Sequence, residues 1–131
     1  MKRIVFLSTL LSAFIFSSCS KSNNDNASAS SIKTIRYDFT TTNAANYGIQ
    51  AIADTLIYSD SATALTWSKT ITVMGSDSAF FAVYPPVAWV NTTNAADVSL
   101  KIFVNNVEKA SNTAHFIGLD RPNGLKISTA Y

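Results

Sequence analysis

Apolar and polar residues alternate along most of the chain between residues 32 and 131, with the period of two that half-buried β-strands show. The clearest case runs from Val98 to Val104, where alternate positions carry branched aliphatic side chains. Residues 35–39 alternate in the same way, with aromatic side chains at two of the apolar positions. No stretch of useful length shows the period of an amphipathic helix. The pattern therefore predicts a chain folded almost entirely as strands.

Turn-forming residues divide this alternation into short segments. We expect strands over residues 32–40, 47–58, 65–73, 79–84, 98–104, 107–110, 115–119 and 125–131. Residues 59–63 are predicted to form a loop. Asn105 and Asn106 are predicted to form a two-residue hairpin turn, because asparagine tolerates the positive φ that such turns require. Lys69 interrupts an apolar face, which indicates a β-bulge or the edge of a sheet.

The number and spacing of these segments indicate the fold class. Seven or eight short strands over about 100 residues, with turns roughly every 8–12 residues, are typical of a two-layer sandwich. We therefore predict an all-β protein with one domain, residues 32–131, folded as an antiparallel immunoglobulin-like β-sandwich of about seven strands. A small closed barrel is the alternative that the same pattern allows.

The first 18 residues have a different composition. Lys2 and Arg3 give a positive start, residues 4–16 carry no charge, and the small residues Ser17 and Ser18 follow. This arrangement is typical of a secretory signal peptide. The apolar run is shorter than the roughly 20 residues that a membrane-spanning helix needs.

A lone cysteine follows this segment directly. Residues 16–19, Phe-Ser-Ser-Cys, resemble a bacterial lipobox, with Phe16 where leucine is usual. The resemblance implies cleavage after residue 18 and a lipid on Cys19 that anchors the protein to the membrane. Ser20 stands in place of the aspartate associated with inner-membrane retention, so we expect a lipid-anchored protein at the outer membrane of a bacterial cell envelope. An ordinary secretory signal with an incidental cysteine is the alternative.

The segment from Cys19 to Ser31 contains no large apolar side chain and is rich in Ser and Asn. It cannot bury enough surface to offset its ordering entropy, so we predict a flexible polar linker that spans roughly 20 Å. Removing 18 of the 131 residues leaves 113, with eight basic and eight acidic residues. A formally neutral mature chain argues against nucleic acid as a partner, because nucleic-acid binding calls for a basic surface.

Three stretches of the domain resemble the MmpS-like family of small envelope proteins. Residues 56–60 are similar to its Ile-Thr-Tyr turn element, and residues 65–69 to its Leu-Pro-Trp element, with Thr66 in place of the proline. Residues 98–109 are similar to its strand, tight turn and strand, with Asn105–Asn106 where the family has Asp-Gly. The resemblance implies an immunoglobulin-like sandwich that assists a large lipid or siderophore exporter. The best-known members carry a transmembrane helix and a cysteine pair, which this chain lacks.

The inventory of reactive side chains does not favour an enzyme. His115 is the only histidine, Glu108 the only glutamate, and no Gly-x-Ser-x-Gly motif is present. A hydrolytic triad and a pair of facing carboxylates both require more than this. One histidine without free cysteines cannot form a zinc site, so we expect neither metal nor cofactor. A position at the edge of a strand is the simpler explanation of His115.

Residues 84–89, Tyr-Pro-Pro-Val-Ala-Trp, are the one stretch that suggests a binding surface. Tyr84 and Trp89 beside two rigid prolines could form a platform for a sugar or an apolar partner, although both aromatic residues could also fill the core. The sequence thus leaves two functions open. The first is a non-catalytic interaction or accessory module that docks onto an envelope protein assembly, for example a transporter. The alternative is a surface module that binds a glycan or another ligand through Tyr84 and Trp89.

Overall fold

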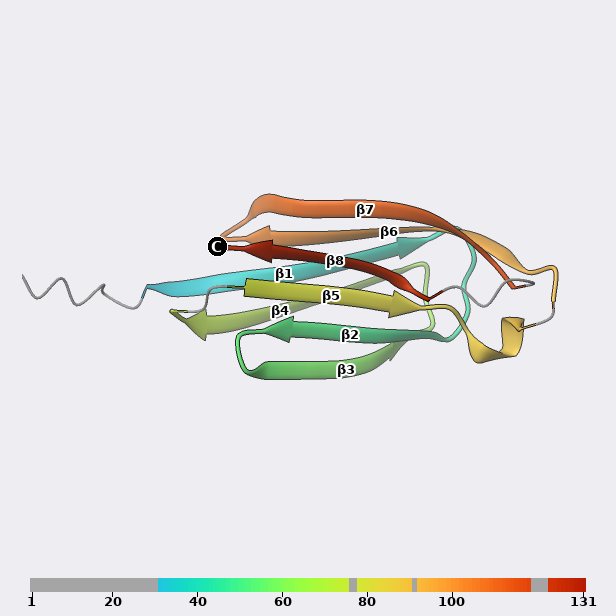
Figure 1. Cartoon of the computed structure of the whole chain (residues 1–131), viewed down its shortest axis with the longest axis horizontal. Coiled ribbons are helices and arrows are strands. Elements are labelled where there is room, and N and C mark those ends of the chain that lie inside the picture. The colour runs from blue at the N-terminus through green and yellow to red at the C-terminus, as the bar shows by residue number, and fades with distance from the viewer. Residues whose placement is uncertain (1–30, 76–77, 91, 119–122) are drawn as a thin grey trace, which may run out of the picture.

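The computed structural model describes residues 31–75, 78–90, 92–118 and 123–131, which fold as two antiparallel four-stranded sheets packed face to face (Figure 1). The elements in chain order are β1 (Ile32–Thr41), β2 (Tyr47–Ala53), β3 (Leu56–Ala62), β4 (Thr66–Met74), β5 (Ser78–Tyr84), the short 3₁₀ helix η1 (Val87–Trp89), β6 (Ala95–Val104), β7 (Val107–Ile117) and β8 (Leu125–Ala130). Sheet A has the order β4-β1-β6-β7, and sheet B the order β3-β2-β5-β8. The predicted antiparallel β-sandwich is confirmed, with eight strands.

The strand order differs from that of the immunoglobulin constant domain. In the immunoglobulin constant domain the first strand lies at the edge of its sheet, whereas here β1 lies between β4 and β6. Many sandwich domains share the architecture without sharing one strand order.

The N-terminal features that the sequence predicts lie outside the described residues. The predicted signal peptide (1–18), the lipidation site Cys19 and residues 20–30 of the predicted linker all lie outside the described residues. The first strand begins at Ile32, at the start of the predicted domain. Among the described residues, no helix has the length and apolar character needed to cross a membrane.

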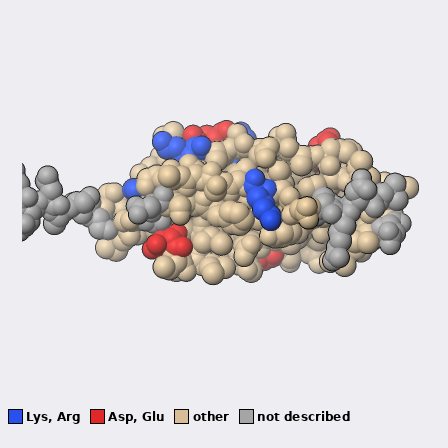
Figure 2. Space-filling model, viewed as in Figure 1, with Lys and Arg blue, Asp and Glu red and all other residues tan. Residues whose placement is uncertain are grey.

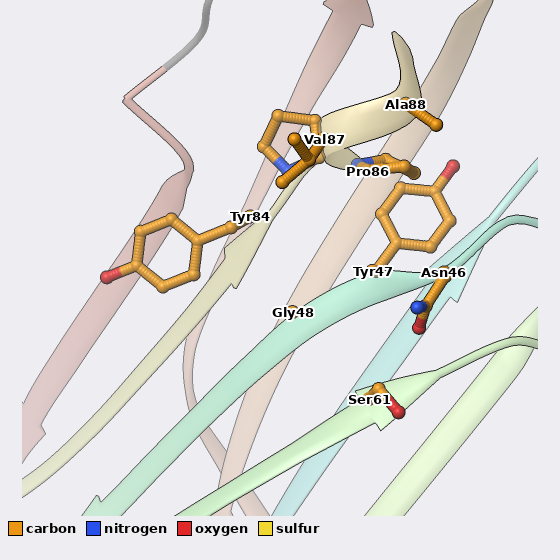
Figure 3. Close-up of a pocket in the computed structure, with 9 residues that line it drawn as sticks. Asn46, Tyr47, Gly48, Ser61, Tyr84, Pro86, Val87 and Ala88 are labelled. Carbon is orange, nitrogen blue, oxygen red and sulfur yellow. The ribbon is translucent and has the colours of Figure 1, made fainter.

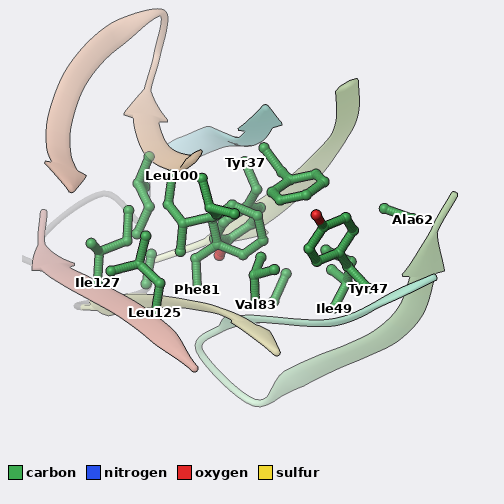
Figure 4. Packing of buried hydrophobic residues seen from close by; sticks show 14 of the residues in the cluster. Tyr37, Tyr47, Ile49, Ala62, Phe81, Val83, Leu100, Leu125 and Ile127 are labelled. Carbon is green, nitrogen blue, oxygen red and sulfur yellow. The ribbon is translucent and has the colours of Figure 1, made fainter. Parts of the chain in front are cut away.

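The core lies between the sheets and is formed mainly by the inward-facing residues of the four central strands (Figure 4). Alternation places Tyr37, Phe39 and their neighbours inward from β1, and the aliphatic series of β6 packs beside them. The Tyr37 ring meets Phe81 of the opposite sheet edge-on, with ring centres 5.3 Å apart. Its hydroxyl donates to the Ile52 carbonyl at 2.6 Å, so one residue joins both sheets by packing and by a hydrogen bond. Burial raises the pKa of Tyr37 well above its usual value.

Two expectations about sheet B are wrong in detail. Residues 47–58 do not form one strand, because a tight turn at Asp54–Thr55 separates β2 from β3. Asp54 adopts a left-handed conformation (φ 55°), which aspartate tolerates better than most residues. The predicted loop 59–63 belongs largely to β3, where Ser59 pairs with Gln50 and Asp60 with Ile49. Polar residues are compatible with this strand because it lies at the edge of its sheet.

Sheet A shows the same kind of difference. The predicted strand 107–110 and residues 115–117 of the predicted strand 115–119 belong to one strand, β7, which continues through Ser111, Asn112 and Thr113. Residue 119 lies outside the described residues. β7 is also an edge strand, and His115 lies on it as expected. The hairpin turn at Asn105–Asn106 is confirmed, with φ of 50° and 66°.

Lys69 lies on the edge strand β4, in regular register with Tyr37. The sequence indicated an edge or a bulge at this position, and the edge is the correct alternative. A register shift does occur in the β6–β7 pair, between Ile102 and Phe103.

The two ends of the sandwich differ in what they carry. β1 begins and β8 ends at one end, which we call the near end, together with the β2–β3 and β6–β7 turns (Figure 1). The opposite, distal end carries η1 and the loop of residues 42–46. At roughly 3.3 Å per residue, the ten residues of β1 separate the two ends by about 30 Å.

Candidate functional site

The middle of the outer face of sheet A carries polar side chains that bind one another, while the exposed apolar residues Ile32 and Met74 lie near the strand ends. Arg36 pairs with Asp38 at 3.2 Å, Asp38 also accepts a hydrogen bond from the Ser68 hydroxyl at 2.7 Å, and the Arg36 guanidinium lies over the Phe103 ring. Two further pairs join β6 to β7. They are Lys101–Glu108 at 2.8 Å and His115–Asp97 at 2.7 Å.

These interactions supply partners for Glu108 and His115, the two residues of sheet A considered as possible catalytic groups. The Lys101 hydrogen bond, with a further one from Ser111, lowers the pKa of Glu108 and keeps it ionised. His115 binds Asp97 on the exposed surface, and no cluster of three or more potential metal ligands occurs among the described residues.

The outer face of sheet B has a different character. Ile57, Ile52 and Phe80 are paired across β3, β2 and β5, and together they form what we call the apolar row. Ile57 is 68% exposed, while Ile52 and Phe80 are half-buried. Figure 2 looks onto this face, where charged groups lie mostly along the rim, apart from one basic patch near the middle. The ion pairs Arg36–Asp38, Lys101–Glu108 and His115–Asp97 all belong to sheet A.

A pocket of about 340 Å³ opens on sheet B at the distal end, where β5 ends and η1 begins (Figure 3). It is lined by Asn46, Tyr47, Gly48, Ser61, Tyr84, Pro85, Pro86, Val87 and Ala88. Pro85 and Pro86 follow β5, and η1 begins at the next residue. The volume lies at the lower end of the range for small-ligand pockets, about 300–1,000 Å³.

Tyr47 and Gly48 give the pocket its back wall and its floor. The Tyr47 hydroxyl donates to the Asn43 carbonyl at 2.9 Å and lies 3.0 Å from the Thr41 hydroxyl, which fixes the ring. Burial raises the pKa of Tyr47, so the side chain is neutral. Gly48 pairs with Ser61 on one side and with Tyr84 on the other. The missing side chain of Gly48 therefore leaves a hollow between Ser61 and Tyr84.

The two aromatic residues suggested for binding lie in different environments. Tyr84 lines the pocket and is 37% exposed. Trp89 is 6% exposed, and its ring meets Tyr47 edge-on in the core. The backbone of Trp89 is held by hydrogen bonds with the Pro86 carbonyl and the Thr92 amide. Trp89 is thus a core residue, as one of the two alternatives from the sequence had it, and it forms no surface platform with Tyr84.

Edge strands β3 and β4 are joined by side chains rather than by backbone pairing. The Trp67 indole donates to Asp60 at 3.1 Å and its ring stacks on Phe81, while the Lys69 ammonium lies 4.0 Å from the centre of the Tyr58 ring. The Ser61 amide, followed by the Trp67 indole, lowers the pKa of Asp60. The contact between the Lys69 ammonium and the Tyr58 ring explains how a lysine can occupy the inward face of β4.

Sequence reasoning identified Tyr84 and the two prolines but missed Asn46, Gly48 and Ser61. An isolated glycine within a strand pattern was the available signal, because it weakens a strand and often marks the close approach of another group. Ser61 is not predicted because the sequence predicts a loop over residues 59–63.

Comparison with known proteins adds no functional assignment. No protein-family model matches the chain, and a search of curated proteins finds no match.

Proposed function

We propose that this chain is a non-catalytic interaction module of the bacterial cell envelope, anchored through a lipid on Cys19, which docks onto an envelope protein assembly through strand β3. The observation that carries this proposal is the apolar row, which begins on an exposed edge strand. Contiguous exposed apolar side chains commonly mark interaction surfaces.

A comparison of the four edge strands favours β3 as the docking strand. β4 has Lys69 on its inward face, β7 carries a register shift and charged pairs, and β7 also lies beside β8. Inward charges, bulges and covering elements are devices that prevent unwanted strand pairing. Within Leu56–Ala62 there is no proline, no lysine and no register shift against β2, and its one charged residue, Asp60, already accepts a hydrogen bond from the Trp67 indole.

The chemistry of β3 suits an added strand. Its free backbone edge can form main-chain hydrogen bonds with a partner, and Ile57 can bury its side chain against that partner. The resemblance to the MmpS-like family suggests an exporter as the assembly. Lipid attachment at Cys19 would keep the module on the membrane that holds such an assembly.

The test is cross-linking in intact cells, followed by identification of the proteins bound to a tagged, natively anchored chain. Cys19→Ala removes the lipid site, and Ile57→Lys places a charge on the docking strand. The matched control is Ile117→Lys, which makes the same change at an exposed isoleucine on the edge strand of sheet A.

We expect a defined membrane complex for the native chain and for Ile117→Lys. Its yield should fall by roughly tenfold or more in Cys19→Ala and in Ile57→Lys. A complex that survives Ile57→Lys, or that responds equally to both lysine variants, would contradict docking through β3. Failure to recover any reproducible protein partner would contradict the interaction function itself.

A further inference from the structure

The floor of the distal pocket is a glycine that the backbone does not require. Gly48 lies within β2 and pairs regularly with both neighbouring strands, and its φ lies outside the left-handed region that favours glycine. A Cβ built on Gly48 would lie 3.6 Å from Tyr84 Cβ and 3.8 Å from Cδ2, which are ordinary contact distances. An alanine would therefore fit, and it would cost less conformational entropy than glycine in the strand. Folding alone does not account for Gly48.

The absent side chain opens space beside the Tyr84 ring. Gly48 adjoins one edge of that ring, and Gly124 adjoins the other, because a Cβ on Gly124 would lie 2.8 Å from Tyr84 Cδ1. Gly124 needs its left-handed conformation (φ 76°), so its lack of a side chain has a structural cause that Gly48 lacks. The partly exposed ring thus has a hollow at its side, bounded by Pro86 and Val87 on η1 (Figure 3).

The composition of the wall indicates the chemistry of a ligand. Tyr84 and the prolines offer rigid apolar surface, while the exposed residues Ser61 and Asn46 bring a hydroxyl and a carboxamide to the rim. None of the lining residues carries a carboxylate, ammonium, guanidinium or imidazole group. An aromatic face combined with neutral polar groups suits a molecule that has both C–H faces and hydroxyl groups.

We propose that this hollow binds one neutral pyranose ring of a glycan. The sugar ring stacks on Tyr84 over Gly48, and its hydroxyl groups bond to Ser61 and Asn46. An acyl chain fits less well because polar groups border an open pocket, and a charged probe tests whether the Lys126 ammonium, 6.0 Å from the centre of the Tyr84 ring, favours an anionic sugar instead. This proposal can be tested apart from docking through β3, because Gly48 and Tyr84 lie outside the apolar row and Ser61 is the one residue of the site that belongs to β3.

The pocket also has a favourable location. It lies at the end of the sandwich opposite the start of β1, about 30 Å along the strand direction. The end that faces away from the N-terminal attachment is the one that a tethered domain presents to an external glycan.

Binding is tested with the ¹⁵N-labelled full-length protein in detergent micelles, by following its amide NMR signals. The neutral probes are D-glucose, D-galactose, D-mannose and N-acetyl-D-glucosamine. D-glucuronate serves as the charged probe, and N-acetylphenylalaninamide represents the side chain of a peptide partner. Gly48→Val fills the hollow, and its matched control Gln50→Val makes the same type of change two residues along the outer face of β2.

We expect at least one neutral sugar to give saturable shifts at Gly48, Ser61 and Tyr84, with a dissociation constant on the order of 1 mM. Gly48→Val should weaken that binding at least about tenfold, while Gln50→Val should leave it within about twofold. Tyr84→Ala should also abolish it, and the amide spectrum of each variant establishes that the fold is intact.

Three results would overturn the assignment. The first is the absence of saturable shifts with all four sugars at about 50 mM. The second is binding that persists in Gly48→Val. The third is equal or tighter binding of D-glucuronate or N-acetylphenylalaninamide, which would assign the hollow to a charged ligand or to a peptide. A negative result here leaves the cross-linking outcome for β3 unaffected.

Discussion

The two outer faces of the sandwich expose different kinds of side chain to solvent. On sheet A, polar side chains satisfy one another, as in the Arg36, Asp38 and Ser68 group. On sheet B, the exposed residues of the apolar row and the Tyr84 pocket have no comparable network among the described residues. Both faces cover the same core, and both belong to four-stranded antiparallel sheets.

The difference separates the needs of folding from those of binding. Burial of Tyr37 and Phe81 stabilises the folded state. An isoleucine that is 68% exposed, such as Ile57, and a glycine within a strand, such as Gly48, add little to that stability. The middle of the outer face of sheet A is polar apart from Phe103, which lies under an arginine, whereas its exposed apolar residues Ile32 and Met74 lie near the strand ends. In the proposals above, the apolar row and the Gly48 hollow serve binding rather than folding.

The largest expected effect concerns Tyr84 and Trp89, because the contrast requires one on the surface and the other in the core. Trp89→Ala should destabilise the protein by about 3–5 kcal/mol, since it empties space beside Tyr47. Tyr84→Ala should cost about 1 kcal/mol or less. Thermal unfolding of the full-length protein measures both, and Trp89→Ala should lower Tm by more than about 12 °C.

The opposite ranking would overturn this part of the comparison. If Trp89→Ala left Tm unchanged while Tyr84→Ala lowered it strongly, Trp89 would belong to the surface. Trp89→Phe is a useful intermediate, because it keeps an aromatic ring beside Tyr47 and should cost less than the alanine variant.

The difference between central and edge strands explains two of the errors in the predicted strand boundaries. Alternation located β1, β5 and β6 well, because both flanking strands and the core constrain their side chains. It failed at Ser59–Ser61 on β3 and at Ser111–Thr113 on β7, where an edge strand can carry consecutive polar residues and still pair on one side. Polar runs predict loops only when no neighbouring strand supplies a partner.

The candidate site was predictable only in part for a related reason. The sequence predicted Tyr84 and the prolines, because these residues are neighbours along the chain. Gly48 and Ser61 join Tyr84 only through the β3–β2–β5 register, which the sequence does not contain. The burial of Trp89 likewise depends on η1 placing it against Tyr47.

A smaller effect tests whether the polar network of sheet A contributes to stability. Asp38→Ala removes the ion pair with Arg36 and the hydrogen bond from Ser68, and it should cost about 0.5–1 kcal/mol because the group is partly exposed. Ser59→Ala, on the outer face of sheet B, should stay within about 0.5 kcal/mol. Repeating the unfolding in about 1 M salt should reduce the Asp38 effect. An Asp38 effect no larger than that of Ser59→Ala would show that the network does not stabilise sheet A.

The smallest expected effect is local and lies where the edges of the two sheets meet. Asp60 accepts hydrogen bonds from the Ser61 amide and the Trp67 indole, and these lower its pKa in the folded state. A carboxylate with a lowered pKa stabilises the folded state above its unfolded pKa, near 3.9, and that contribution is lost as the pH falls through the folded value. Trp67 fluorescence should therefore change below about pH 4, and Asp60→Asn should remove this transition. If the transition persisted in Asp60→Asn, acid would act elsewhere, for example at Glu108 on sheet A, and the link between β3 and β4 would not depend on the Asp60 charge.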